Sequence, residues 1–338
     1  MKTDIEIAAV GDILMWHPQI ASARLEGSSH YDFLPMFERV APYFQEADLV
    51  LGNLETTLSG REKQYQQKNP ATGYPMFNCP DELAFALKAS GFDVLTTANN
   101  HSMDRGMAGL RHTIQVLDRI GLSHTGTFAS AQDATKPLVM TARGIRVGIL
   151  AYTYGTNFIT VPKEQAFAVS LSNPVKMVRD VKKMKQHADL ILVAMHFGQE
   201  FHHKPSANQR RLARLLFQAG ADVVLGSHPH VLQPMESILL KDDFGQHKMR
   251  YVIYSLGNFI STRMRNDPYT QQSCILRIHA FKDQESALIR HVDILPTLVR
   301  QISSREAKSY FVLPLSSRVR DGNLNALRHS IVRQVLTS

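Results

Sequence analysis

The chain has 338 residues, of which 44% are hydrophobic, and is therefore long enough to bury one large core. Its 38 Lys and Arg against 30 Asp and Glu give a net charge of +8, which favours an anionic partner. Two cysteines, Cys79 and Cys274, exclude a disulfide framework. No segment has the roughly 18 consecutive apolar residues of a spanning helix, and the start lacks the features of a signal peptide, so the expected location is cytoplasmic, with a membrane-associated or extracytoplasmic location as the alternative.

A short apolar strand is expected at residues 5–10, directly before Gly11 and Asp12. Further along the chain, one unit recurs four times, in which an Asp precedes a short apolar strand and a polar loop. Its copies are residues 48–55, 93–101, 189–196 and 222–230. Because each run is almost continuously apolar, these strands are expected to be buried on both faces of a parallel sheet.

Helices are expected between these strands, where Pro or an N-cap residue precedes a helical apolar stripe and Gly ends it. They are residues 80–91, 107–121, a segment beginning at 173–174, and 206–220. Further strands are expected at 147–152 and 252–256. This alternation predicts an α/β fold. No linker divides the chain, so residues 1–338 are expected to form a single domain, with a motif-bearing core at about 5–260 and C-terminal strands and a helix at about 271–338.

Polar residues that can bind a metal follow these strands. In open α/β sheets, ligands bind beyond the carboxyl ends of the strands, where the loops converge. The residues found there are Asp12, Glu55, Asn100, His101, His196, His228 and His230. Carboxylate, imidazole and amide oxygen without thiolate suit Mn²⁺, Fe or Zn²⁺. Six or seven ligands exceed one tetrahedral site, so two divalent ions are expected.

Each residue alone also has a structural interpretation. Asp12 is compatible with a helix cap, Asn100 with a turn, and His196 with a buried histidine that is hydrogen-bonded and binds no metal. His228 and His230 are different, because burying two imidazoles one residue apart would be costly without a function. Three residues past another strand end are also candidates for the lining of a substrate pocket. They are Tyr152, Tyr154 and Asn157.

The ordered motifs resemble a known family. They are Gly11-Asp12, GNLE at 52–55, ANNH at 98–101 with Asp104 and Gly106, HFGQE at 196–200, GSHPHVLQ at 226–233 and YSLGNF at 254–259. Together they resemble the bacterial capsule-synthesis CapA family, the poly-gamma-glutamate synthesis proteins, which is similar to the calcineurin-like metallophosphoesterases.

This resemblance implies a four-layer α/β/β/α sandwich with a dinuclear metal site at one edge. By the same resemblance, metal ligands are expected at Asp12, Glu55, Asn100, His196, His228 and His230, which match the family motifs. His101 would be the catalytic histidine that protonates a leaving group or stabilises charge in the transition state, and Asp104 would either orient His101 or cap the following helix. Asn53, Glu200 and Asn258 are expected to contact the substrate.

Two positions depart from the phosphoesterase pattern. Leu14 stands where a histidine is expected, and Asn53 stands where the second motif has an aspartate. Depletion of one of the two ion sites is therefore an alternative, unless Glu55 or Asn53 compensates.

The first functional hypothesis is a metal-dependent hydrolase that acts on a phosphoester, or on an acyl or amide bond in an anionic polymer such as poly-gamma-glutamate. The second is a non-catalytic accessory protein that holds a polyanion for a membrane capsule-synthesis complex. A nucleotide-binding loop of the Gly-x-x-x-x-Gly-Lys type is absent from the sequence, so an ATP-driven ligase is not expected. No basic stretch interleaved with aromatics occurs, and specific nucleic-acid binding is not expected either.

Overall fold

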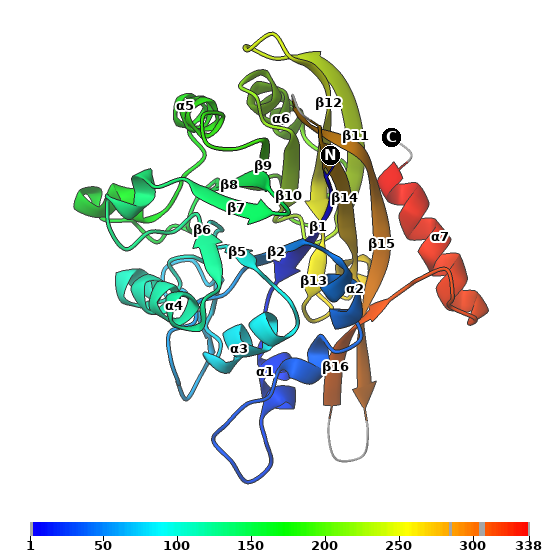
Figure 1. Cartoon of the computed structure of the whole chain (residues 1–338). Helices are drawn as coiled ribbons and strands as arrows, with labels where there is room; N and C mark the ends of the chain where they lie inside the picture. Colours follow the sequence, from blue (N-terminus) through cyan, green and yellow to red (C-terminus); the bar gives the residue numbers. More distant parts are fainter. Residues whose placement is uncertain (1–2, 284–285, 304–307, 337–338) are drawn as a thin grey trace.

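The structure is a computed structural model that describes residues 3–283, 286–303 and 308–336. Most strands belong to two mixed β-sheets (Figure 1). The first sheet has the order β16-β15-β14-β1-β2-β5-β6, with β13 also paired to β1. Its strands are β1 (Thr3–Ile13), β2 (Leu49–Leu54), β5 (Val94–Thr96), β6 (Ser123–Thr125), β13 (Asn258–Ile260), β14 (Gln272–Lys282), β15 (Ala287–Ser303) and β16 (Lys308–Pro314).

The second sheet has the order β11-β12-β10-β9-β8-β7. Its strands are β7 (Leu138–Ala142), β8 (Ile145–Thr153), β9 (Leu190–His196), β10 (Val223–Ser227), β11 (Leu232–Lys241) and β12 (His247–Leu256). A separate small sheet pairs β3 (Gln66–Lys68) with β4 (Pro75–Phe77).

The helices are α1 (His17–Ala23), α2 (Ala41–Glu46), α3 (Glu82–Ala89), α4 (Gly106–Ile120), α5 (Pro174–Met184), α6 (Ala207–Gln218) and α7 (Gly322–Leu336). Short 3-10 helices occur at Leu34–Met36, Asp133–Thr135, Lys163–Ala168 and Pro268–Gln271. No helix in the described ranges is long and apolar enough to cross a membrane. The four helices expected from the sequence are confirmed as α3, α4, α5 and α6. Ser206 forms a capping box at α6, and Gly121 ends α4 in the left-handed conformation.

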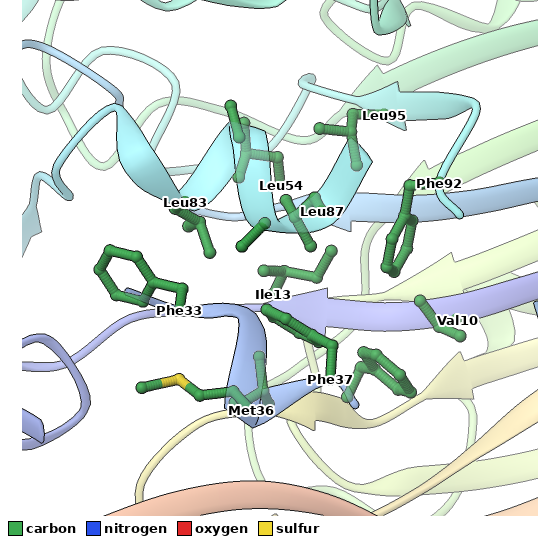
Figure 2. Packing of buried hydrophobic residues seen from close by; sticks show 14 of the residues in the cluster. Val10, Ile13, Phe33, Met36, Phe37, Leu54, Leu83, Leu87, Phe92 and Leu95 are labelled. Carbon is green, nitrogen blue, oxygen red and sulfur yellow. The ribbon is translucent and has the colours of Figure 1, made fainter. Parts of the chain in front are cut away.

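Three clusters of apolar side chains show how these elements pack. One cluster lies between the two sheets, because it combines Ile7 of β1 with Val147 of β8 and Leu192 of β9. A second joins the other face of the first sheet to the N-terminal helices. In Figure 2, Leu83 and Leu87 of α3 lie above Ile13 of β1. The third joins the second sheet to α5 and α6.

Helix α7 has a different position from the other helices. Its buried residues Ile331 and Val335 belong to the cluster between the sheets, and the helix contacts β11 and β15 (Figure 1). It therefore covers one side of that core. The α/β class is confirmed, whereas the strict four-layer order stays a prediction.

The recurring Asp-strand unit has a structural explanation. At the start of each of these strands, the Asp backbone N–H donates to the carbonyl of one residue on the neighbouring strand, and the Asp carboxylate accepts from the backbone N–H of that same residue at 2.8–2.9 Å. The pairs are Asp48 with Glu6, Asp93 with Val50, Asp189 with Arg146, and Asp222 with Ile191. This reciprocal bond fixes the register in which each strand enters its sheet.

In the unit at residues 93–101, the strand is Val94–Thr96 and the segment after it turns, as expected of a short strand followed by a polar loop. In that turn Ser102 Oγ donates to the carbonyls of Thr97 and Asn99. The four repeated strands divide between the sheets, two in each, instead of sharing one parallel sheet.

Candidate metal centre

The carboxyl ends of parallel strands from both sheets meet at one place. In the first sheet, Asp12 of β1 lies opposite Asn53 of β2. In the second, His196 of β9 lies opposite Ser227 of β10. Because β1 contacts β10, these two pairs face each other between the sheets. All seven residues predicted at strand ends lie here, and each is at most 4% exposed. They are Asp12, Glu55, Asn100, His101, His196, His228 and His230.

Glu55 is common to two groups of potential ligands. One group is Asp12, Glu55 and His196, the other is Glu55, His228 and His230, and in each the ligand atoms lie within 4.8 Å of one another. Glu55 Oε1 is 3.4 Å from His196 Nε2 and 3.9 Å from His230 Nε2. Neither Glu55 oxygen has a hydrogen-bond partner among the described residues. A buried carboxylate that accepts no hydrogen bond and lies beside three imidazoles is well suited to bind a divalent cation.

The two asparagines of the site have different orientations. Asn100 directs its Oδ1 toward His196 Nε2, at 2.8 Å, and its Nδ2 donates to Asn157 Oδ1. Asn53, in contrast, directs its Nδ2 inward and donates to Asp12 Oδ1 at 2.8 Å. As oriented here, Asn100 offers an oxygen to a metal, whereas Asn53 positions Asp12.

His101 and Asp104 form a buried pair beside the ligands. His101 Nδ1 lies 2.7 Å from Asp104 Oδ2, and Asp104 also accepts the backbone N–H of Phe77. Asp104 does not cap α4, whose N-cap position is Arg105 without a side-chain cap. Of the two roles predicted for Asp104, the geometry therefore supports orientation of His101.

The loop after β10 has a strained backbone. His228 has a φ of 100° and His230 a φ of 59°, in the left-handed region that non-glycine residues rarely occupy. Each such residue costs on the order of 1–3 kcal/mol. The rest of the fold compensates for this strain, and both imidazole rings face the cluster. The ring centroids of His196 and His228 are 4.9 Å apart, and those of His228 and His230 are 6.0 Å apart.

Burial is the largest influence on protonation here. It lowers the pKa of His196 to about 3 and that of His228 well below its usual value. Burial, reinforced by the nearby charge of Asp12, raises the pKa of Glu55 well above its usual value. Asp12 and His230 are exceptions, because their mutual hydrogen bond and charge outweigh burial, so that the pKa of Asp12 is lowered and that of His230 is raised. The lowered pKa values favour neutral imidazoles at His196 and His228, and a neutral imidazole has one nitrogen lone pair that can bind a metal.

A cavity of about 330 Å³ opens beside His101 and His230. Its wall is largely apolar and includes Leu14, Trp16 and Phe77, with Arg263 and Arg265 at its exposed rim. Leu14, at the position where the phosphoesterase pattern has a histidine, thus contributes to the wall of this cavity.

The predicted substrate-contacting residues separate into three positions. Glu200 lines the cavity and accepts a hydrogen bond from Tyr74. Asn53 lies within the cluster itself. Asn258 lies behind His230, where its Oδ1 is 3.0 Å from His230 Nδ1, so it is placed to orient that ring.

Among the additional pocket candidates, Tyr154 and Asn157 lie at the site. The Tyr154 ring is 4.7 Å from that of His228, and Asn157 Nδ2 is 3.5 Å from His101 Nδ1. The interpretation of Tyr152 was wrong. Its ring packs against α5, its hydroxyl donates to Asp180, and it lines a different cavity of about 370 Å³, because alternate residues of a strand point to opposite faces.

Sequence reasoning missed several contributors. Asn99 accepts the backbone N–H of His101 and donates to the carbonyl of Leu54, which fixes the turn that presents Asn100. Its place in an Asn-Asn pair directly after a strand was an available signal. Phe77 packs edge to face on His101 at 4.6 Å. It is 24 residues away and lies in a short strand, and nothing in the sequence pattern pointed to it.

Comparison with known proteins agrees with this arrangement. A family model described as bacterial capsule synthesis protein PGA_cap matches residues 6–263. The capsule biosynthesis protein CapA of Bacillus anthracis is 30% identical over 312 residues, which cover 90% of this chain and 70% of that protein. The PGA biosynthesis protein CapA of Bacillus subtilis is 31% identical over 267 residues, covering 78% of this chain but only 66% of that protein.

Among solved structures, the calcineurin-like phosphoesterase YfkN from Bacillus subtilis matches with a TM-score of 0.52 and 14% identity, over 98% of both chains. This likeness shows a shared fold. The family match, which spans the strands that carry all the candidate ligands, shows more: the chain belongs to the bacterial capsule synthesis family that includes the CapA proteins.

Proposed function

We propose that the protein is a metal-dependent hydrolase whose centre holds two divalent ions, Mn²⁺, Fe or Zn²⁺. The observation that carries the proposal is Glu55, a fully buried carboxylate with no hydrogen-bond partner among the described residues, shared by two ligand groups. Asp12, His196 and Asn100 would hold one ion, His228 and His230 the other, and Glu55 would contact both. Oxygen and imidazole ligands without thiolate fit these metals.

Divalent ions at such a centre supply electrophilic activation of a phosphoryl or acyl group and make water more acidic at neutral pH. The chain's own residues complete the chemistry. Asp104 holds His101 through Nδ1, so that Nε2 remains to exchange a proton with a leaving group in the adjoining cavity. Asn258 and Asp12 fix the ring of His230 from its Nδ1 side.

The cavity supports an anionic organic substrate. Its apolar wall accommodates a carbon chain or ring, while Arg263 and Arg265 at the rim favour phosphate or carboxylate groups. We therefore expect a phosphoester, or an acyl or amide bond within an anionic polymer. The names of the CapA relatives favour capsule polymers such as poly-gamma-glutamate as the class to test first.

The test combines metal analysis with turnover. Protein reconstituted with Mn²⁺ or Zn²⁺ is assayed on p-nitrophenyl phosphate, on its bis-ester and on poly-gamma-glutamate. His101→Asn should retain its metal and lose at least about 100-fold in kcat, since general acid catalysis contributes about 10²–10⁴-fold. His112→Asn is the matched control, because this histidine also pairs with an aspartate but lies outside the centre. If the protein bound two ions but turned over none of these substrates, the proposal of a metal-dependent hydrolase would be refuted.

A second candidate function is a non-catalytic accessory protein that holds a polyanion for a membrane capsule-synthesis complex. Two observations favour it. Leu14 supplies no ligand, and Asn53 directs a donor, not an oxygen, at Asp12. On this alternative, poly-gamma-glutamate should bind without being cleaved, and Arg263→Ala with Arg265→Ala should weaken its binding. Shortening of the polymer chains by wild-type protein would exclude it.

A further inference from the structure

A second group of metal-binding side chains lies far from the proposed catalytic centre, on the first sheet. Glu6 of β1, His279 of β14 and His291 of β15 lie side by side in the strand register, and Asp293 follows two residues along β15. Glu6 is six residues before Asp12 on the same strand, so this group is about 20 Å from the catalytic centre at about 3.3 Å per residue.

Three of these residues direct ligand atoms at one point. Asp293 Oδ2 is 2.9 Å from His279 Nε2 and 3.7 Å from His291 Nε2. The potential ligand atoms of His279, His291 and Asp293 all lie within 4.8 Å of one another. Tetrahedral ligands about 2.1 Å from a zinc ion are about 3.4 Å apart, so only small side-chain movements separate this arrangement from a coordinated one.

The surroundings hold these ligands in place. Glu6 Oε2 lies 3.5 Å from His279 Nδ1, the ring nitrogen that faces away from Asp293. A carboxylate on Nδ1 is the arrangement that directs Nε2 of a histidine toward a metal. Arg277 donates to Asp293 Oδ1 at 2.7 Å, which leaves Oδ2 for the two imidazoles.

A β-bulge brings the two histidines together. The pairing of β14 with β15 shifts between His279 and Ala280, so that Arg290 is an extra residue in β15 immediately before His291. The two rings are stacked, with centroids 4.1 Å apart. The side chains of His279, Asp293 and His291 are 25%, 34% and 55% exposed, so an ion can enter from solvent.

We infer that His279, His291 and Asp293 form a second metal site, which takes Zn²⁺ or another borderline transition ion. A set of two imidazoles and one carboxylate binds such ions in preference to Mg²⁺ or Ca²⁺. Three protein ligands leave one position for water or an external group. The bound ion would link β14 to β15 at the end of the sheet opposite the proposed catalytic centre. This second site does not depend on hydrolase activity.

The test counts zinc per chain by equilibrium dialysis and elemental analysis. His291→Ala and Asp293→Asn should each bind one zinc ion fewer than wild type, and Zn²⁺ should raise their Tm less. His187→Ala is the matched control, because it removes an exposed histidine outside the group. Since His291 is half exposed, we expect its variant to fold, and an unchanged Tm without zinc checks this.

An unchanged zinc count in folded His291→Ala would overturn the inference. The outcome is independent of the catalytic centre. If that centre bound no metal at all, His291→Ala would still lose one ion relative to wild type, whereas His228→Ala would lose none.

Discussion

Protonation at the candidate metal centre follows from burial and from one ion pair. Glu55 has a raised pKa because of burial and the nearby charge of Asp12, and His230 has a raised pKa because its contact with Asp12 outweighs burial. Both groups therefore hold protons in the metal-free protein up to a higher pH than they would in an unfolded chain. A divalent ion needs the deprotonated carboxylate and imidazole, so metal and proton compete for these residues.

Metal affinity at this centre is therefore predicted to rise with pH. Binding should release protons over the pH range in which these two groups still hold them, and each released proton increases the affinity about tenfold per pH unit. Calorimetry in two buffers of different ionisation enthalpy measures this release directly. Glu55→Gln should bind less metal and release fewer protons. Binding that is independent of pH would show that the ion contacts neither residue.

The pair formed by His101 and Asp104 gives a second prediction at this scale. Asp104→Asn keeps the shape of the side chain but removes the charge that fixes His101. Loss of such an orienting partner typically costs about 10–100-fold, so kcat should fall by that amount while metal content stays at the wild-type value. A shift of the pH profile of kcat distinguishes a positioning role from general destabilisation. Identical pH profiles of kcat for the variant and the wild-type protein would contradict the positioning role of Asp104.

The sequence was a good guide to which residues gather and a poor one to their orientation. Asp12, His196, His228 and His230 were predicted because each follows a buried strand, and strand ends converge. The inward direction of the Asn53 amide nitrogen depends on the rotation of its side chain. The hydrogen bond from the Phe77 backbone N–H to Asp104 depends on the position of a short strand. No periodicity in the sequence encodes either.

At the scale of single elements, the four reciprocal Asp bonds explain why short strands enter the sheets in a defined register. Burial raises the pKa of Asp93, whereas the pKa of Asp189 is lowered. Burial would raise its pKa, but Arg146 and Lys282 outweigh burial and lower it from 3.8 to about 2. The negative charge of Asp189 therefore stabilises the start of β9. Arg146 of β8 donates to this carboxylate through both its backbone N–H and its guanidinium.

Asp189→Asn is predicted to lower stability by about 1 kcal/mol at neutral pH, a small value because Arg146 is half exposed and screened. The folded-state pKa lies below the unfolded value, so the contribution of Asp189 is complete above about pH 4 and disappears as the pH falls toward about 2. Urea unfolding at several pH values measures the difference. Asp118→Asn, at a largely exposed position, is the control. A difference that grew as the pH fell would contradict the assignment.

Strands with continuous apolar runs were predicted well, whereas the edge strands β6, β7 and β11 were missed. β9 and β10 are apolar up to their last residues, His196 and Gly226-Ser227, whereas β11 at the edge of the second sheet contains Pro234 and alternates in exposure. An edge strand needs a partner on one side only and tolerates proline, so its composition resembles that of a loop. Its pairing with β12 is set by the fold as a whole.

For the whole molecule, the arrangement of strands into two sheets lies beyond what sequence patterns specify. β1 pairs with β2 on one side and with β14 on the other, although β14 begins beyond the family match at residue 263. Local propensity predicts each strand, but the pairing of distant strands depends on how the apolar faces cover one another. The C-terminal strands thus complete the sheet that carries Asp12 and Glu55.

This topology predicts that the chain unfolds as one cooperative unit, with α7 included. Ile331 of α7 is fully buried in the core between the sheets, and Gln334 donates to the carbonyl of Leu232, two residues after His230. Ile331→Ala should therefore cost about 2–5 kcal/mol and shift a single unfolding transition, by calorimetry, to lower temperature. His329→Ala, on the exposed face of the same helix, should leave it unchanged. A separate early transition in the Ile331→Ala variant, with the main one at its original temperature, would instead mean that the C-terminal helix unfolds independently of the two sheets.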